Sequence, residues 1–320
     1  MRELVIVIAD LYLAADAAAA EPGLPGLAQL VRFGERLPLE RGWREWLARW
    51  IGRDDLARVA PANLVAARGN DSWLATPLHL QAGLTTLHFD ARGILRPPPE
   101  ELAELASDFR RTFDSTLVPL ESGELLLQAA IPATLTTEPA RIAAGHVAEA
   151  LPKGAGAARL RRLGAEIEMW LHEHPVNRAR TARNDLSITT LWIWGGGEDA
   201  PIERSAAGVV ARGLGSDSYL RALWQLTGGQ TEPLPEQLDA AFSYAGAAVL
   251  VVEVGRMSRV SVSESLGEVD RRFIAPAVAA LRRRDIDRLS VLVNDRRLLL
   301  GSRAHRKFWR RPRPVLESLR

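Results

Sequence analysis

Short apolar runs alternate along the chain with amphipathic stretches. The first run, residues 4–8, is continuous and β-branched, and Asp10 follows it closely. Such a run is typical of a strand buried on both faces of a parallel sheet. Similar runs recur at 248–254 and 289–293. Because open parallel sheets place their sites at the carboxyl ends of their strands, we expect Asp10 to lie at a functional edge.

Helical patterns separate these runs. The apolar spacing predicts helices over 27–33, 43–51, 99–113, 160–171, 219–226 and 265–284. The segment 265–268, Ser-Leu-Gly-Glu, has capping-box spacing, and Pro276 predicts a kink within the helix that follows it. The helix at 160–171 is expected to stop at His174-Pro175. The tryptophans at 43–51 suit either an aromatic binding surface or packing against the sheet, and the amphipathic spacing favours packing.

Strands that alternate with helices favour an α/β fold, a doubly wound and mostly parallel sheet. Residues 97–155 combine one helix with a strand near 125–131, and a Pro-Lys-Gly loop ends the segment. We therefore expect two parts. Residues 1–96 and 156–320 form the α/β core, and residues 97–155 form a small α+β insert.

Composition narrows the possible partners. The 320 residues include no cysteine, so any metal would need His, Asp or Glu ligands. The net charge is +2 and the basic residues are almost all arginine, which explains a pI near 9.4 without favouring a nucleic-acid partner. No apolar run approaches the roughly 20 residues of a membrane helix. The opening residues are interrupted too soon by Asp10 to be a signal peptide, so we expect a cytoplasmic protein.

Several common site motifs are missing. There is no G-x-G-x-x-G after the first strand, no P-loop, no G-x-S-x-G and no H-E-x-x-H. The glycines at 195–197 suit either an oxyanion site or a tight turn, and the turn is the commoner case. The basic segment 303–313 suits either phosphate binding or a solvated surface, and the solvated surface is favoured on the sequence alone.

Two segments resemble a known family. The run His174-Pro175-Val176-Asn177-Arg178, followed by Leu-Trp-Ile-Trp-Gly-Gly-Gly at 191–197, is similar to a signature of archaeal-type cofactor-independent phosphoglycerate mutases. Arg180 or Arg183 stands near the family arginine. The resemblance covers mainly 165–200 and 265–318, and it implies an alkaline-phosphatase-like fold. The run Ala-Thr-Pro-Leu-His-Leu at 75–80 resembles a motif of bacterial RpfE-type regulatory proteins.

The resemblance implies a metal site of which only part remains. The family enzymes hold two divalent metals with Asp and His ligands over a phosphoserine. Asp10, Asp295 and His305 match family ligands, but Arg296 stands where the partner histidine of Asp295 is expected. The segment 255–259, Gly-Arg-Met-Ser-Arg, lacks the family Asp-x-x-x-His pair. Asn70 occupies the serine position, and Ser72 is the nearest substitute nucleophile.

Three hypotheses follow. In the first, the chain is a non-catalytic, regulatory relative that needs no cofactor and binds a phosphorylated small molecule or a protein. Its anion site would use His174, Asn177, Arg178 and Arg296, since arginine supplies a permanent cation. In the second, it is a divergent metal-dependent phosphotransferase or phosphatase with Mn or Zn on Asp10, Asp295 and His305. The third, a nucleic-acid-binding regulator using the basic segment, is the least favoured.

Overall fold

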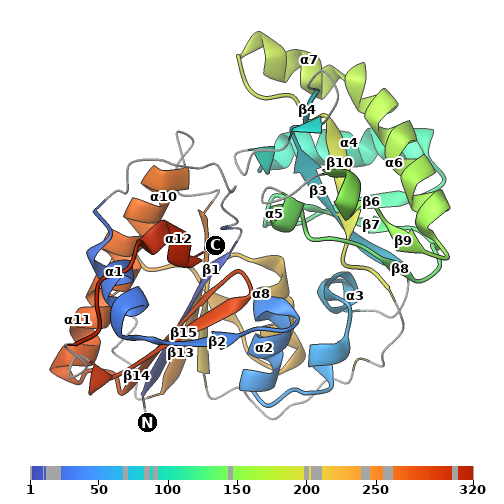
Figure 1. Cartoon of the computed structure of the whole chain (residues 1–320). Coiled ribbons are helices and arrows are strands. Elements are labelled where there is room, and N and C mark those ends of the chain that lie inside the picture. Colours follow the sequence, from blue (N-terminus) through green and yellow to red (C-terminus); the bar gives the residue numbers. More distant parts are fainter. Residues whose placement is uncertain are drawn as a thin grey trace. The chain divides into compact units, whose positions relative to one another are not determined.

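The computed structural model describes residues 2–9, 11, 23–67, 71–82, 87–88, 93–142, 147–197, 202, 211–238, 246–254, 262–304 and 309–319. The chain divides into two compact units (Figure 1). The first unit combines Met1–Ala57 with Arg204–Arg320, and the second is Arg58–Glu203. The short 3₁₀ turn η1 (Leu56–Arg58) lies at the boundary in sequence.

The first unit is built on a seven-stranded, mostly parallel sheet. Its order is β12 (Thr231–Glu232), β11 (Ala211–Leu214), β13 (Ala247–Glu253), β1 (Glu3–Ala9), β14 (Arg288–Val293), β15 (Arg296–Gly301) and β2 (Glu35–Pro38). Strands β12 to β14 in this order are parallel, whereas β15 runs antiparallel to both of its neighbours. All seven residues of β1 are buried, as expected for a central strand.

Helices cover both faces of this sheet (Figure 1). Leu4, Ile6 and Ile8 belong to the apolar core formed with one group of helices. This group is α1 (Pro25–Phe33), α10 (Val262–Val269), the π-helical turn η5 (Asp270–Ile274), α11 (Ala275–Arg283) and α12 (Val315–Leu319). The other face carries α2 (Gly42–Trp50) and α8 (Ser218–Leu226), and Trp50 Nε1 of α2 lies 3.4 Å from Glu3 Oε2. The first unit therefore has the predicted α/β architecture with a mostly parallel sheet.

The predicted kink near Pro276 appears as a π-helical turn. Proline has no N–H to donate to the residue four positions earlier, so the regular ladder cannot continue through it. The turn η5 ends directly before Ala275, and Pro276 lies in the first turn of α11. The preceding helix α10 begins at Val262, three residues before the predicted start at Ser265.

The second unit has an antiparallel four-stranded sheet. Its order is β10 (Thr190–Trp194), β3 (Ser72–Leu78), β7 (Leu125–Gln128) and β6 (Thr116–Pro119). Its helices are α3 (Pro61–Ala66), α4 (Pro99–Thr112), α5 (Pro139–Ile142), η3 (Val147–Ala150), α6 (Ala157–His172) and α7 (Pro175–Ala182). Two short ribbons pair β4 (Gln81–Ala82) with β5 (Leu87–His88) and β8 (Thr134–Leu135) with β9 (Lys153–Gly154).

The division of the chain differs from the predicted insert at 97–155. Strand β7, within that range, pairs with β3, and β3 pairs with β10. Residues on both sides of the predicted insert thus share its sheet and its apolar core. The unit boundary lies at 57/58 and 203/204 because these pairings join the segments. Among the described helices, none is both long and apolar enough to cross a membrane.

Candidate functional site

The carboxyl end of β14 places Asp295 at the sheet edge where a site is expected. Asn294 adopts a left-handed backbone (φ +54°), so the chain turns directly from β14 into β15. The Asp295 carbonyl accepts a hydrogen bond from Leu39 N at 2.7 Å, which ties the end of β2 to this turn. The two other predicted metal ligands, Asp10 and His305, lie outside the described residues.

Arg296 points toward the end of α12. Its Nη1 donates to the Ser318 carbonyl at 2.9 Å, and Asn294 Nδ2 donates to the Leu319 carbonyl at 2.9 Å. The last carbonyls of a helix lack partners within the helix, and a cation near them is favourable. The β14–β15 turn therefore holds α12 in place through an arginine at the position where the family resemblance expects a histidine.

Two acidic residues at the same edge escaped the sequence analysis. Glu253 ends β13 in register with Ala9 of β1, and only 6% of it is exposed. Asp217 follows β11 and caps α8, because its Oδ1 accepts from Leu220 N at 2.9 Å. The sequence contained a signal for Glu253, because this acid stands at the end of an apolar run just as Asp10 does. Asp217 had no such signal because the strand before it is short.

The residues of the predicted metal site are described only in part. Across the described ranges, no three His, Cys, Asp or Glu side chains gather closely enough to hold a metal ion. Of the predicted trio, Asp295 alone lies within those ranges. The trio therefore stays a prediction.

His174 lies in the second unit and begins α7. Its Nδ1 accepts a hydrogen bond from Val176 N at 3.2 Å, and its ring meets the Trp170 ring edge-on at 4.6 Å between centroids. Its Nε2 lies 3.3 Å from Asp108 Oδ2 without hydrogen-bond geometry. Burial lowers the pKa of His174 below its ordinary value, although Asp108 opposes this shift. A neutral imidazole that accepts at Nδ1 is thus an N-cap for α7, at the point where the sequence predicted that the preceding helix stops.

Asn177 ties three segments together. Its Nδ2 donates to the Leu171 carbonyl at 2.7 Å and to the Ile188 carbonyl at 2.8 Å. Its Oδ1 accepts from Ile188 N at 2.8 Å. Both amide protons are therefore used within the protein, and none is left for an anion. The neighbouring Arg178 is exposed.

The arginines near the family position form a structural ion cluster. Glu101 of α4 accepts from Arg180 Nη1 at 2.6 Å and from Arg183 Nη2 at 2.5 Å. Arg180 Nε also donates to the Leu186 carbonyl at 2.7 Å. Both guanidinium groups are thus engaged in holding α4 against α7.

Ser72 is distant from the His174–Asn177 segment. Ser72 opens β3, and Leu78 ends it. The segment after α7 joins the far end of β3, where Thr189 N donates to the Leu78 carbonyl at 2.8 Å. Six residue steps along a strand span about 20 Å. Ser72 therefore does not share a pocket with Asn177 in this unit.

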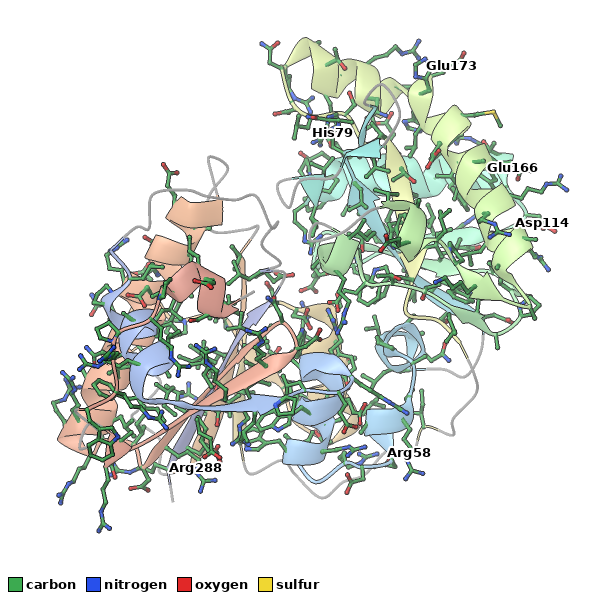
Figure 2. All side chains as sticks on the ribbon, viewed as in Figure 1. Arg58, His79, Asp114, Glu166, Glu173 and Arg288 are labelled. Carbon is green, nitrogen blue, oxygen red and sulfur yellow. The ribbon has the colours of Figure 1, made fainter. Side chains whose placement is uncertain are left out.

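The glycine run at 195–197 and His79 of the run at 75–80 also form hydrogen bonds within the protein. Gly195 N donates to Thr136 Oγ1 at 3.0 Å, and the Gly195 carbonyl accepts from Ala62 N at 2.8 Å. In the run at 75–80, His79 Nδ1 lies 2.8 Å from the Ser187 carbonyl oxygen. Figure 2 shows this histidine just beyond β3. These contacts favour the tight-turn interpretation of the glycine run.

The predicted site residues thus fall into two groups in different units. Asp295 and Arg296 belong to the first unit, and Ser72, His174, Asn177 and Arg178 belong to the second. Within the first unit, Asp295 and Arg296 share one turn. Within the second, the His174–Arg178 run opens a helix, and the groups of His174 and Asn177 are occupied by structural bonds.

Comparisons with known proteins found distant likenesses. No protein-family model matches the chain, and no curated protein matches it. A cofactor-independent phosphoglycerate mutase from Thermoplasma acidophilum aligns over 94% of this chain and 90% of its own, with 12% identity and a TM-score of 0.35. The PH0037 protein from Pyrococcus horikoshii aligns over 94% and 87%, with 12% identity and a TM-score of 0.43. We draw no activity or substrate from them.

Proposed function

We propose that this chain is a degenerate, non-catalytic relative of the phosphoglycerate mutases that works by binding a phosphorylated metabolite or a protein. The observation that carries the proposal is the engagement of Arg296. Its guanidinium donates to the Ser318 carbonyl at the sheet edge, directly beside Asp295. The resemblance expects a metal-binding histidine at this position.

Arginine at this position changes the chemistry of the edge. A guanidinium stays protonated at all ordinary pH values and offers donors only, so it cannot ligate a metal. Its fixed positive charge opposes a divalent cation at the neighbouring carboxylate. Phosphoryl transfer in a two-metal site depends on those cations to stabilise charge and activate the nucleophile. The same guanidinium, however, suits an oxyanion ligand.

A regulatory or ligand-binding role would use the first unit's sheet edge. Arg296 is the member of the predicted anion site that lies there, and its Nη1 bond to Ser318 leaves further N–H donors on the fork. His174 and Asn177 are committed to α7, so we assign them a structural role in this proposal.

A divergent metal-dependent phosphatase is the competing function. The observation in its favour is the position of Asp295 at the carboxyl end of β14. It requires Asp10 and His305 to join Asp295 around one Mn or Zn ion.

A turnover screen separates the two functions. Purified protein is assayed with a panel of phosphate monoesters in the presence of added Mn²⁺ or Zn²⁺, beside Asp295→Asn and the control Asp54→Asn, an exposed acid of the same unit. We expect no hydrolysis or phosphoryl transfer above the Asp295→Asn background. Turnover that is lost in Asp295→Asn and kept in Asp54→Asn would contradict the proposal.

A further inference from the structure

Residues 309–314 lie beside the edge strand β2 in the first unit. Arg310 Nη1 donates to the carbonyls of Phe33 and Gly34, at 3.2 and 3.0 Å, directly before β2 begins. The Arg310 carbonyl accepts from Arg32 Nε at 2.6 Å. Beyond this segment, α12 is fixed to the β14–β15 turn through Ser318 and Leu319. The segment between these anchors therefore passes along the strand edge.

Strand register brings two arginines to the same face of this edge. Arg36 of β2 pairs with Leu298 of β15, and Arg296 lies two residues before Leu298. Such diagonal neighbours lie about 7–8 Å apart on one face of an antiparallel pair. Arg313 stands two residues before α12, the helix that Arg296 contacts. We call Arg36, Arg296 and Arg313 the arginine triad.

The triad gathers three positive charges near the β2 edge. Some other arginines pair with acids, as Arg53 does with Asp55 and Arg212 with Glu232. Within the described residues, no ion pair joins a carboxylate to any member of the triad. Burial, followed by repulsion from Arg313 and Arg296, lowers the pKa of Arg36. Like charges close together repel each other, and an anion placed between them would reduce that repulsion.

We propose that the arginine triad binds a phosphate monoester group. Guanidinium forks match the oxygens of a phosphate, and a monoester dianion offsets two of the three charges. The group would come from a small metabolite or from a phosphorylated side chain of a protein. This inference rests on the proposed function and names its binding site.

Calorimetric titration with inorganic phosphate and with glycerol phosphate tests the triad. The variants are Arg36→Gln and Arg313→Gln. The control is Arg282→Gln, an exposed arginine on α11 with the same change in charge. We expect each triad variant to bind both probes about tenfold more weakly or worse, because a hydrogen bond to a charged group is lost. The control should bind within about twofold of the parent, since distant surface charges are screened.

Thermal unfolding separates a binding role from a structural one. In phosphate-free buffer, Arg36→Gln should unfold at the same or a higher temperature than the parent, because repulsion is relieved. Phosphate should raise the unfolding temperature of the parent more than that of the variant. A lower unfolding temperature in Arg36→Gln together with unchanged phosphate affinity would overturn the inference. So would a parent protein that binds neither probe.

Binding measurements with further probes identify the source of the phosphate group. Tighter binding of a phosphoserine peptide than of its unphosphorylated form, with loss in Arg36→Gln, supports a protein source, and preference for glycerol phosphate supports a metabolite. Preferential binding of duplex DNA with a steep salt dependence would overturn the monoester assignment. Unchanged phosphate affinity in both triad variants would show that the triad is not the binding site, and it would leave the proposed function untouched. Metal-dependent turnover would contradict the proposed non-catalytic function, and the triad would then be a binding site for the phosphate group of the substrate.

Discussion

At the scale of single residues, two of the predicted binding residues have structural roles. His174 caps α7 and Asn177 bonds to Leu171 and Ile188. The motif spacing explains both roles. A residue before proline is extended, which suits an N-cap, and the third helical residue faces back toward the preceding helix end. The motif therefore specifies a helix junction as much as a binding site.

His174 predicts a pH dependence of stability. Its pKa is lower in the folded protein than in the unfolded chain, so the unfolded chain takes up the proton first as pH falls. The free energy of unfolding should be fully retained above about pH 7 and should decrease as pH falls through about 6.5. Asp108 and Glu104 on α4 oppose the shift, and Arg178 on α7 adds to it.

His174→Asn provides the matched comparison, because asparagine keeps an N-cap acceptor without titrating. Urea unfolding of both proteins at pH 7.5 and 5.5 measures the difference. The parent should lose more free energy of unfolding than the variant between these values. An equal loss in the two proteins would show that His174 does not titrate as stated.

Sequence alone could not reveal which polar groups were already occupied. The sequence identified Asn177 and His174 as chemically capable side chains, which they are. Their partners are backbone atoms of Leu171, Val176 and Ile188, and backbone atoms carry no residue signature. The arginine triad was hidden for a related reason, because it depends on the register between β2 and β15.

At the scale of elements, Asn177 joins the end of α6, the start of α7 and the approach to β10. Asn177→Ala removes three buried hydrogen bonds: the N–H and the carbonyl of Ile188 lose their side-chain partner, whereas the Leu171 carbonyl still accepts from His174 N. We expect a loss of about 3 kcal/mol in the free energy of unfolding. Arg178→Ala, an exposed neighbour on the same helix, should change it by less than about 0.5 kcal/mol. Chemical denaturation measures both, and equal effects would contradict the junction role.

The apolar runs predicted the central strands well. The runs at 4–8, 248–254 and 289–293 correspond to β1, β13 and β14. A strand that is buried on both faces gives a continuous apolar run, which can be recognised in the sequence. Strand β15 carries two arginines, and the edge strand β2 beside it carries an arginine and a proline, so their pattern predicted no strand. Helix α7 was missed because its eight residues contain one valine and little apolar periodicity.

At the scale of the whole molecule, the sequence predicted one large, mostly parallel sheet, and the structure has two larger sheets, a mostly parallel one in the first unit and an antiparallel one in the second. A buried strand has the same apolar pattern whether its neighbours run parallel or antiparallel, so the sequence did not separate the segments of β3 and β10 from the α/β core. The predicted nucleophile Ser72 and the predicted ligand Asp295 belong to different units.

The metal content of the purified protein tests the central claim most directly. The protein is loaded with Mn²⁺ or Zn²⁺, dialysed exhaustively against metal-free buffer and analysed by mass spectrometry, with Asp295→Asn treated in parallel. A non-catalytic chain with Arg296 at its sheet edge should retain well below one ion per chain, and no more than Asp295→Asn. Retention of one or more ions per chain that is lost in Asp295→Asn would contradict this account.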